Sequence, residues 1–167
     1  EVDRPIGKIQ WGEREGFTFI EGRLNVGEPM APPVVHATKE INPKAKLAIV
    51  DGPPGQSCSM VETVRDSSLV ILVAEPTPFG LNDLRLAVEV VCELDLPAVV
   101  VINKSGKHDS DIEAFCAVRS IPVIGKIPHG RTIAHHYASG DILYYSLPEM
   151  KVVFSAIAKD VVGRLAL

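Results

Sequence analysis

The sequence predicts an α/β protein with a doubly wound, mostly parallel sheet and an N-terminal β-hairpin. From residue 47 onward, short and continuously apolar runs alternate with stretches of helical periodicity. This alternation is typical of a parallel sheet that helices cover on both faces. Residues 6–24 instead alternate around a turn that contains glycine, which indicates a hairpin. The 167 residues suffice for one domain, and we expect 1–167 to form a single domain.

The expected elements follow the hairpin in a regular order. A loop rich in glycine and proline spans 25–33, and a short helix is expected over 33–40, because a first turn tolerates proline. The expected strands are 47–50, 69–74, 98–102 and 122–127. The expected helices are 59–65, 81–94, 109–119, 131–139 and 148–165. Ser110 or Asp109 is expected to cap the helix over 109–119.

Composition argues against several classes of function. A net charge of −4 disfavours a broad nucleic-acid-binding surface. No apolar run reaches the roughly 18 residues of a transmembrane segment. The three cysteines are widely spaced and form no C-x-x-C pair, so this segment alone builds neither an iron–sulfur nor a structural zinc site. The histidines lack ligand spacing as well. A reducing, cytoplasmic setting is the simplest interpretation.

The run from Leu47 to Gly55 carries the clearest functional signal. Four apolar residues predict a buried strand, which ends at Asp51 and is followed by Gly-Pro-Pro-Gly. Ligands of open α/β sheets bind outside the carboxyl ends of the strands, where a carboxylate suits a hydrated Mg²⁺ ion. We therefore expect Asp51 to hold Mg²⁺ through water, and the amide of Gly55 to approach a bound phosphate. The alternative is that Asp51 only caps a turn or a helix.

Two later strands are expected to end in polar residues at the same edge. Asn103 and Lys104 follow one strand, and an asparagine amide can both donate to and accept from a purine. The GTPase pattern Asn-Lys-x-Asp is broken by Gly106, which favours adenine over guanine. Pro128 and His129 follow the next strand and could supply backbone contacts to a base. The alternatives are an ordinary turn and an ordinary connection. The loop over 75–80 is interpreted as a rigid connector, and the alternative is that it contacts a partner subunit or the switch loop.

The order of these motifs resembles that of the MinD/ParA-like P-loop ATPases. It is most similar to the MinD-superfamily branch that carries an inserted ferredoxin domain. The motifs are the hairpin and the segments 22–28, 51–55, 75–81 and 101–104. The resemblance implies a P-loop NTPase fold that binds MgATP, hydrolyses it and often dimerises across the nucleotides. It implies that Asp51 is the Walker B-like carboxylate and Gly55 the switch II glycine, and that both take part in catalysis.

The resemblance also implies which residues bind the nucleotide. Asn103 would face the adenine, with Pro128 and His129 lining the base pocket. Pro54 and Lys104 complete the expected cofactor-binding set.

The sequence departs from this family in one large respect. It contains no phosphate loop, signature lysine or switch I aspartate, and none of the ferredoxin cysteines that would hold 4Fe–4S clusters. Because those N-terminal parts are missing, the chain resembles the C-terminal part of such an ATPase domain, and its first residue, Glu1 rather than methionine, also leads us to expect a fragment. Alone it should bind ATP poorly and hydrolyse it negligibly, since the phosphate loop dominates phosphoryl-transfer catalysis. The absent strand should leave unpaired edges in the sheet.

Two other functions remain open from the sequence. The chain could be a non-catalytic α/β protein-interaction module in which Asp51 is structural. It could also resemble a ligase or amidotransferase that uses the same fold on a small carboxylate substrate. For the leading interpretation we expect a homodimer and an iron–sulfur or redox protein as a partner of the longer protein. We expect neither nucleic-acid binding nor a transmembrane segment.

Overall fold

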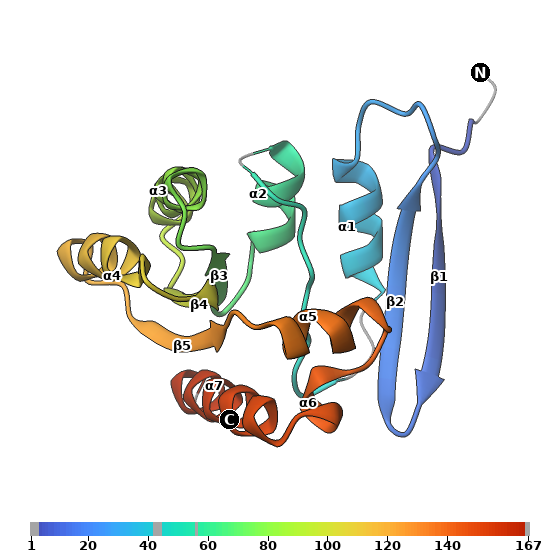
Figure 1. Cartoon of the computed structure of the whole chain (residues 1–167). Helices are drawn as coiled ribbons and strands as arrows, with labels where there is room; N and C mark the ends of the chain where they lie inside the picture. The colour runs from blue at the N-terminus through green and yellow to red at the C-terminus, as the bar shows by residue number, and fades with distance from the viewer. Residues whose placement is uncertain (1–3, 42–44, 56, 166–167) are drawn as a thin grey trace. The chain divides into compact units, whose positions relative to one another are not determined.

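The computed structural model describes residues 4–41, 45–55 and 57–165 (Figure 1). The chain divides into two compact units, Glu1–Arg65 and Asp66–Leu167. Each unit has its own secondary structure, with a hairpin and two helices in the first and a parallel sheet with helices in the second.

The first unit is built on the predicted hairpin. Strand β1 (Gly7–Arg14) pairs antiparallel with β2 (Phe17–Leu24). Glu15 and Gly16 form the two-residue turn, and both have positive φ, as a type I′ hairpin turn requires. Helix α1 (Pro32–Glu40) packs on the strands where Gly22 leaves room, since a Cβ there would lie 2.1 Å from the hydroxyl oxygen of Thr38. The hairpin and the first helix are both confirmed.

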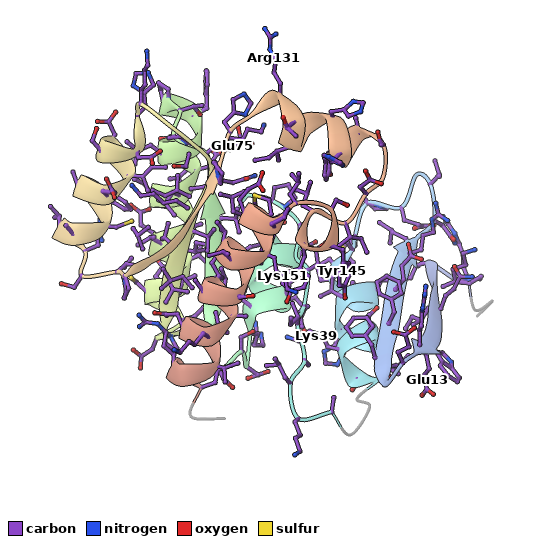
Figure 2. The ribbon with its side chains drawn as sticks, turned by 60° about the horizontal axis from the view of Figure 1, so that its bottom comes forward. Glu13, Lys39, Glu75, Arg131, Tyr145 and Lys151 are labelled. Atoms are coloured by element: carbon purple, nitrogen blue, oxygen red, sulfur yellow. The ribbon has the colours of Figure 1, made fainter. Side chains whose placement is uncertain are left out.

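Helix α2 (Cys58–Val64) packs against α1 and is held there by one lysine. Lys39 points from α1 toward α2 (Figure 2), and its Nζ donates to three carbonyls at the end of α2. These are Glu62 O at 2.8 Å, Thr63 O at 3.1 Å and Arg65 O at 2.7 Å. The last carbonyls of a helix have no intrahelical partners, and a cation also suits the negative end of the helix dipole. Lys39 therefore acts as the C-terminal cap of α2.

The predicted strand over 47–50 is wrong. These residues form no strand, and Ile49 is 85% exposed. A strand needs a neighbour to pair its backbone groups. Within the described part of the chain, residues 47–50 take part in no sheet ladder. An apolar run is therefore not sufficient for a strand without a partner.

The second unit contains a three-stranded parallel sheet in the order β3-β4-β5. Its strands are β3 (Val70–Ala74), β4 (Ala98–Ser105) and β5 (Val123–Pro128). Helices α3 (Pro78–Glu93) and α4 (Asp109–Val118) lie on one face, and α7 (Pro148–Arg164) lies on the other (Figure 1). The α/β class and the doubly wound arrangement are confirmed.

The core of this unit centres on β4, which has helices on both sides. Val99–Ile102 are at most 3% exposed, as the continuously apolar run predicted. Helix α3 adds Val88 and Val91, and α4 adds Ile112. On the other face Gly125 of β5 admits α7, because a Cβ there would lie 2.4 Å from a side-chain carbon of Ile157.

Several boundaries differ from the expected ones for local reasons. Helix α3 begins at Pro78, earlier than predicted, because the Thr77 side chain accepts a hydrogen bond from Gly80 N. The cap residue of α4 is His108, so the prediction of Ser110 or Asp109 is wrong. Beyond α5 (Arg131–Ala138) a short unpredicted helix, α6 (Leu143–Ser146), precedes α7. No helix among the described residues is long and apolar enough to cross a membrane.

Candidate functional site

The carboxyl edge of the β3-β4-β5 sheet collects most of the predicted site residues. Ala74, Ile102 and Lys126 lie side by side in the ladder. The chain continues from these positions into Glu75, Asn103 and the end of β5. The backbone N–H of His129 donates to Ser105 O at 3.3 Å, which joins the loop after β5 to the end of β4. The structure thus brings Asn103, Lys104, Pro128 and His129 together.

The end of β4 has an irregular backbone. Ile102 pairs with Lys126 and Ser105 pairs with Pro128, so two residues of β4 lie opposite one residue of β5. The two are Asn103 and Lys104, and they form a β-bulge. Lys104 has φ of 53°, a left-handed conformation that costs a non-glycine residue roughly 1–2 kcal/mol. Bulges and backbone strain of this kind are frequent at functional sites, where they re-aim side chains.

An ion pair holds Lys104 across the strand ends. Its Nζ lies 2.7 Å from Oε1 of Glu75, the residue that follows β3. Figure 2 shows Glu75 at this end of the sheet. Both side chains are about half exposed, so the pair contributes at most about 1 kcal/mol to stability. From its sequence, Glu75 was expected only to be part of a rigid connector. Its position directly after a strand, like that of Asn103, was the signal that would have included it.

The Asn103 side chain is held in place by the backbone of the next residue. Its Oδ1 accepts a hydrogen bond from Lys104 N at 3.0 Å. Within the described part of the chain its Nδ2 has no partner, although the residue is half buried. The amide therefore offers two N–H donors, and the remaining lone pair of Oδ1, at the sheet edge. Donors and acceptors of this kind can form hydrogen bonds to the edge of a heterocyclic base.

Among the described residues of this unit, Asp109 is the buried charged side chain. It is 8% exposed, and its Oδ2 accepts from Ser105 Oγ at 2.6 Å while Oδ1 accepts from Gly106 N at 2.8 Å. Lys126 Nζ lies 3.2 Å from Oδ2 and 2.8 Å from Oε1 of Glu113. The Ser105 hydroxyl, then the Gly106 amide and Lys126, hold the pKa of Asp109 below its usual value, although burial opposes them. The acceptors Glu113 and Asp109 raise the pKa of Lys126.

The predicted Mg²⁺ and phosphate loop lies in the first unit. Residues 51–55 are all exposed, and Gly55 has φ of +85°, which favours glycine. Gly52 passes close to α2, since a Cβ there would lie 2.8 Å from Cγ2 of Thr63. Among the described residues the Asp51 carboxylate has no hydrogen-bond or ion-pair partner. This argues against a capping role for Asp51 within that part of the chain.

The donor set at Asp51 fits one kind of metal ion. No group of three or more histidine, cysteine or acidic side chains that could hold a metal occurs among the described residues. A single carboxylate suits Mg²⁺, which keeps several waters and shares its remaining positions with substrate phosphates. It does not suit an ion that needs a full cage of protein ligands.

Comparison with known proteins shows which solved structures have a similar fold. No protein-family model matches the sequence. The chain is similar to the MinD cell division protein of Aquifex aeolicus, with a TM-score of 0.65 and 16% identity over 83% of this chain and 63% of that one. It is also similar to the cell division ATPase MinD of Pyrococcus furiosus, with a TM-score of 0.64 and 23% identity over 78% and 58% of the two chains. The chain shares the P-loop NTPase fold of the MinD proteins.

Two sequence relatives come from Methanocaldococcus jannaschii, and both are uncharacterized. MJ0579 is 30% identical over 140 residues, which are 83% of this chain and 49% of that protein. MJ0578 is 34% identical over 118 residues, which are 68% of this chain and 41% of that protein. The chain therefore spans about half the length of the curated relatives it matches, and a MinD-like fold is what the comparisons add to the sequence.

Proposed function

We propose that this chain is the base-binding and Mg²⁺-binding part of a MinD-like ATPase that acts on MgATP. The observation that carries the proposal is the bulge at the end of β4. It lies at the edge where α/β sheets bind ligands, and among the described residues the N–H donors of Asn103 have no hydrogen-bond partner there. The MinD-like fold supports the same assignment, since the two solved structures include a protein described as an ATPase.

Each predicted residue has a role under this proposal. Asn103 donates to the base, and Pro128 and His129 line the base pocket. Lys104 balances charge at the strand ends with Glu75 as its partner. Asp51 holds a water of the Mg²⁺ ion, which supplies charge neutralisation at the phosphates when bound. Pro54 fixes the path of the loop, and the backbone amide of Gly55 approaches the terminal phosphate of the bound nucleotide.

Hydrolysis belongs to a longer protein that also contains a phosphate loop, and this chain alone should hydrolyse ATP negligibly. The amide cradle and the lysine of that loop supply most of the positioning and charge in phosphoryl transfer. The link of the longer protein to iron–sulfur or redox chemistry is part of the same proposal. An absorption spectrum of the anaerobically purified full-length protein tests it, since bound 4Fe–4S clusters absorb visible light.

The ATPase proposal is tested on the full-length protein with Asp51→Ala. We expect MgATP hydrolysis to fall by roughly 10–100-fold, the usual effect of losing an outer-shell partner of a metal ion. The matched control is Asp83→Ala, which removes an exposed carboxylate from α3. Equal activity in both variants and the wild-type protein contradicts the role of Asp51.

A non-catalytic protein-interaction module is the second candidate, and one observation favours it. The hairpin exposes three aromatic residues, Trp11 at 68%, Phe17 at 65% and Phe19 at 60%. Phe17 and Phe19 share one face of the hairpin, and Trp11 lies on the other. Exposed aromatic residues are enriched at protein-binding surfaces. A partner or a second copy that binds equally well with and without MgATP, in a full-length protein that hydrolyses no ATP, would favour this candidate.

A further inference from the structure

The two loops of the predicted base pocket are joined through one residue of β4. Ser105 accepts the backbone N–H of His129 at its carbonyl oxygen, at 3.3 Å. Its hydroxyl donates in the opposite direction, to Asp109 Oδ2 at 2.6 Å. Ser105 follows Lys104 directly, so it connects the bulge that carries Asn103 with the loop after β5.

Asp109 extends this connection to a second strand. Its Oδ1 accepts from Gly106 N, which closes the loop between β4 and α4, and its Oδ2 also meets the ammonium group of Lys126 at 3.2 Å. Lys126 lies in β5, two residues before Pro128. A closed circuit therefore runs from β4 through Asp109 to β5, and back from His129 to β4.

We propose that Ser105, Asp109 and Lys126 form a positioning clamp that sets the distance between Asn103 and His129, and so the affinity for the base of the bound nucleotide. This inference rests on the proposed function, because the three residues support the groups that would contact the base in the same site. Preorganised sites need such supporting contacts, since small displacements of a binding group weaken an interaction strongly.

The burial and pairing of Asp109 show that it acts through other residues. Both of its oxygens already accept hydrogen bonds, and the residue is 8% exposed. It is therefore not free to bind a base in the way that the carboxylate of Asn-Lys-x-Asp does in GTPases. Lys126 is likewise already paired, because carboxylate oxygens of Asp109 and Glu113 both lie within 3.2 Å of its Nζ. The three residues are positioning residues rather than ligands.

The test compares two ligands in the full-length protein, MgATP and magnesium tripolyphosphate, which lacks a base. In Asp109→Asn, Lys126 keeps Glu113 but loses the charge of Asp109, whereas the shape and one of the two acceptor oxygens are kept. We expect the dissociation constant for MgATP to rise roughly tenfold and that for tripolyphosphate to stay unchanged. Lys126→Met should act in the same way, and Lys126→Arg should restore most of the affinity. The matched control is Lys159→Met, an exposed lysine on α7.

The ratio of the two dissociation constants distinguishes positioning from simple stability. A purely structural clamp would lower the midpoint of unfolding and leave the ratio as it is in the wild-type protein, and that result overturns the inference. Ser105→Ala removes a single hydroxyl and provides a milder variant if the others fold poorly; it should shift the ratio in the same direction. Failure of the wild-type protein to bind MgATP at all would instead overturn the proposed function.

Discussion

Lys126 Nζ on β5 lies 3.2 Å from Asp109 Oδ2 at the start of α4. This ion pair therefore joins β5 to the helix that follows the neighbouring strand, β4. The pair is asymmetric, because Asp109 is buried whereas Lys126 is 42% exposed at its side chain. The carboxylate is therefore the member whose loss matters most for stability.

Asp109 should make the stability of the protein depend on pH in the acid range. Its pKa in the folded protein lies below the ordinary value of 3.8, mainly because the Ser105 hydroxyl and the Gly106 amide donate to the ionised form. A lowered folded pKa adds stability above the unfolded pKa, and this stability is lost as the pH falls through the folded pKa. Urea unfolding should give a difference in the free energy of unfolding between the wild type and Asp109→Asn. We expect this difference to be constant from pH 8 to about pH 5 and to shrink below about pH 4. A difference that is the same at pH 7 and pH 3 contradicts this explanation.

Lys39→Met should destabilise the first unit. The variant keeps the aliphatic stem but leaves three carbonyls at the end of α2 without their donor. We expect the free energy of unfolding to fall by about 1–3 kcal/mol, the cost of losing a charged donor to partly buried acceptors. Lys8→Met, an exposed lysine on β1, is the control and should change it by less than about 0.5 kcal/mol. Denaturant titration measures both, and equal values for the two variants would show that Lys39 is not a cap.

Much of the second unit was predictable from sequence, as were the hairpin and the first helix of the first unit, whereas the expected strand over 47–50 was wrong. The run over 98–102 forms the central strand of the sheet, with helices on both faces of that sheet, so its continuously apolar pattern alone predicted a buried parallel strand. The run over 47–50 has the same character but no ladder partner among the described residues. Pairing is a property of two segments, and one segment's pattern cannot show it.

Some residues of the candidate site were predictable from sequence and others were not. Asn103 and His129 were predictable because residues after parallel strands gather at one edge. The clamp at Asp109 was not, because its contacts join residues 105, 109 and 126, and helix signals alone made Asp109 a cap residue. The bulge at Lys104 was also hidden, since lysine gives no signal for a positive φ.

Lys104→Gly should separate stability from binding. Glycine relieves the left-handed strain of roughly 1–2 kcal/mol, and it removes an exposed ion pair that contributes at most about 1 kcal/mol. We expect the free energy of unfolding to be equal to or slightly above that of the wild type, and MgATP affinity in the full-length protein to fall. Thermal melting and a binding titration measure the two quantities. A large loss of stability would show that the side chain, and not the backbone, is what the bulge requires.

The three cysteines should react at two different rates. Cys58 and Cys92 are exposed, whereas Cys116 is buried in α4. Burial, followed by the nearby charge of Glu113, raises the pKa of the Cys116 thiol, so little reactive thiolate forms. An aromatic disulfide reagent at pH 8 should label two thiols per chain rapidly, and the third only after denaturant is added. Rapid labelling of all three would contradict the packing of α4 on the sheet.

Binding of MgATP by the full-length protein and by its Asn103→Ala variant tests the central claim most directly. Calorimetric titration should show the variant binding roughly 3–10-fold more weakly, as expected for one lost hydrogen bond to the base. Asn82→Ala, which removes an exposed amide from α3, should bind like the wild type. Equal affinity of all three proteins, or no binding by the wild type, would contradict the assignment of this sheet edge as a nucleotide site.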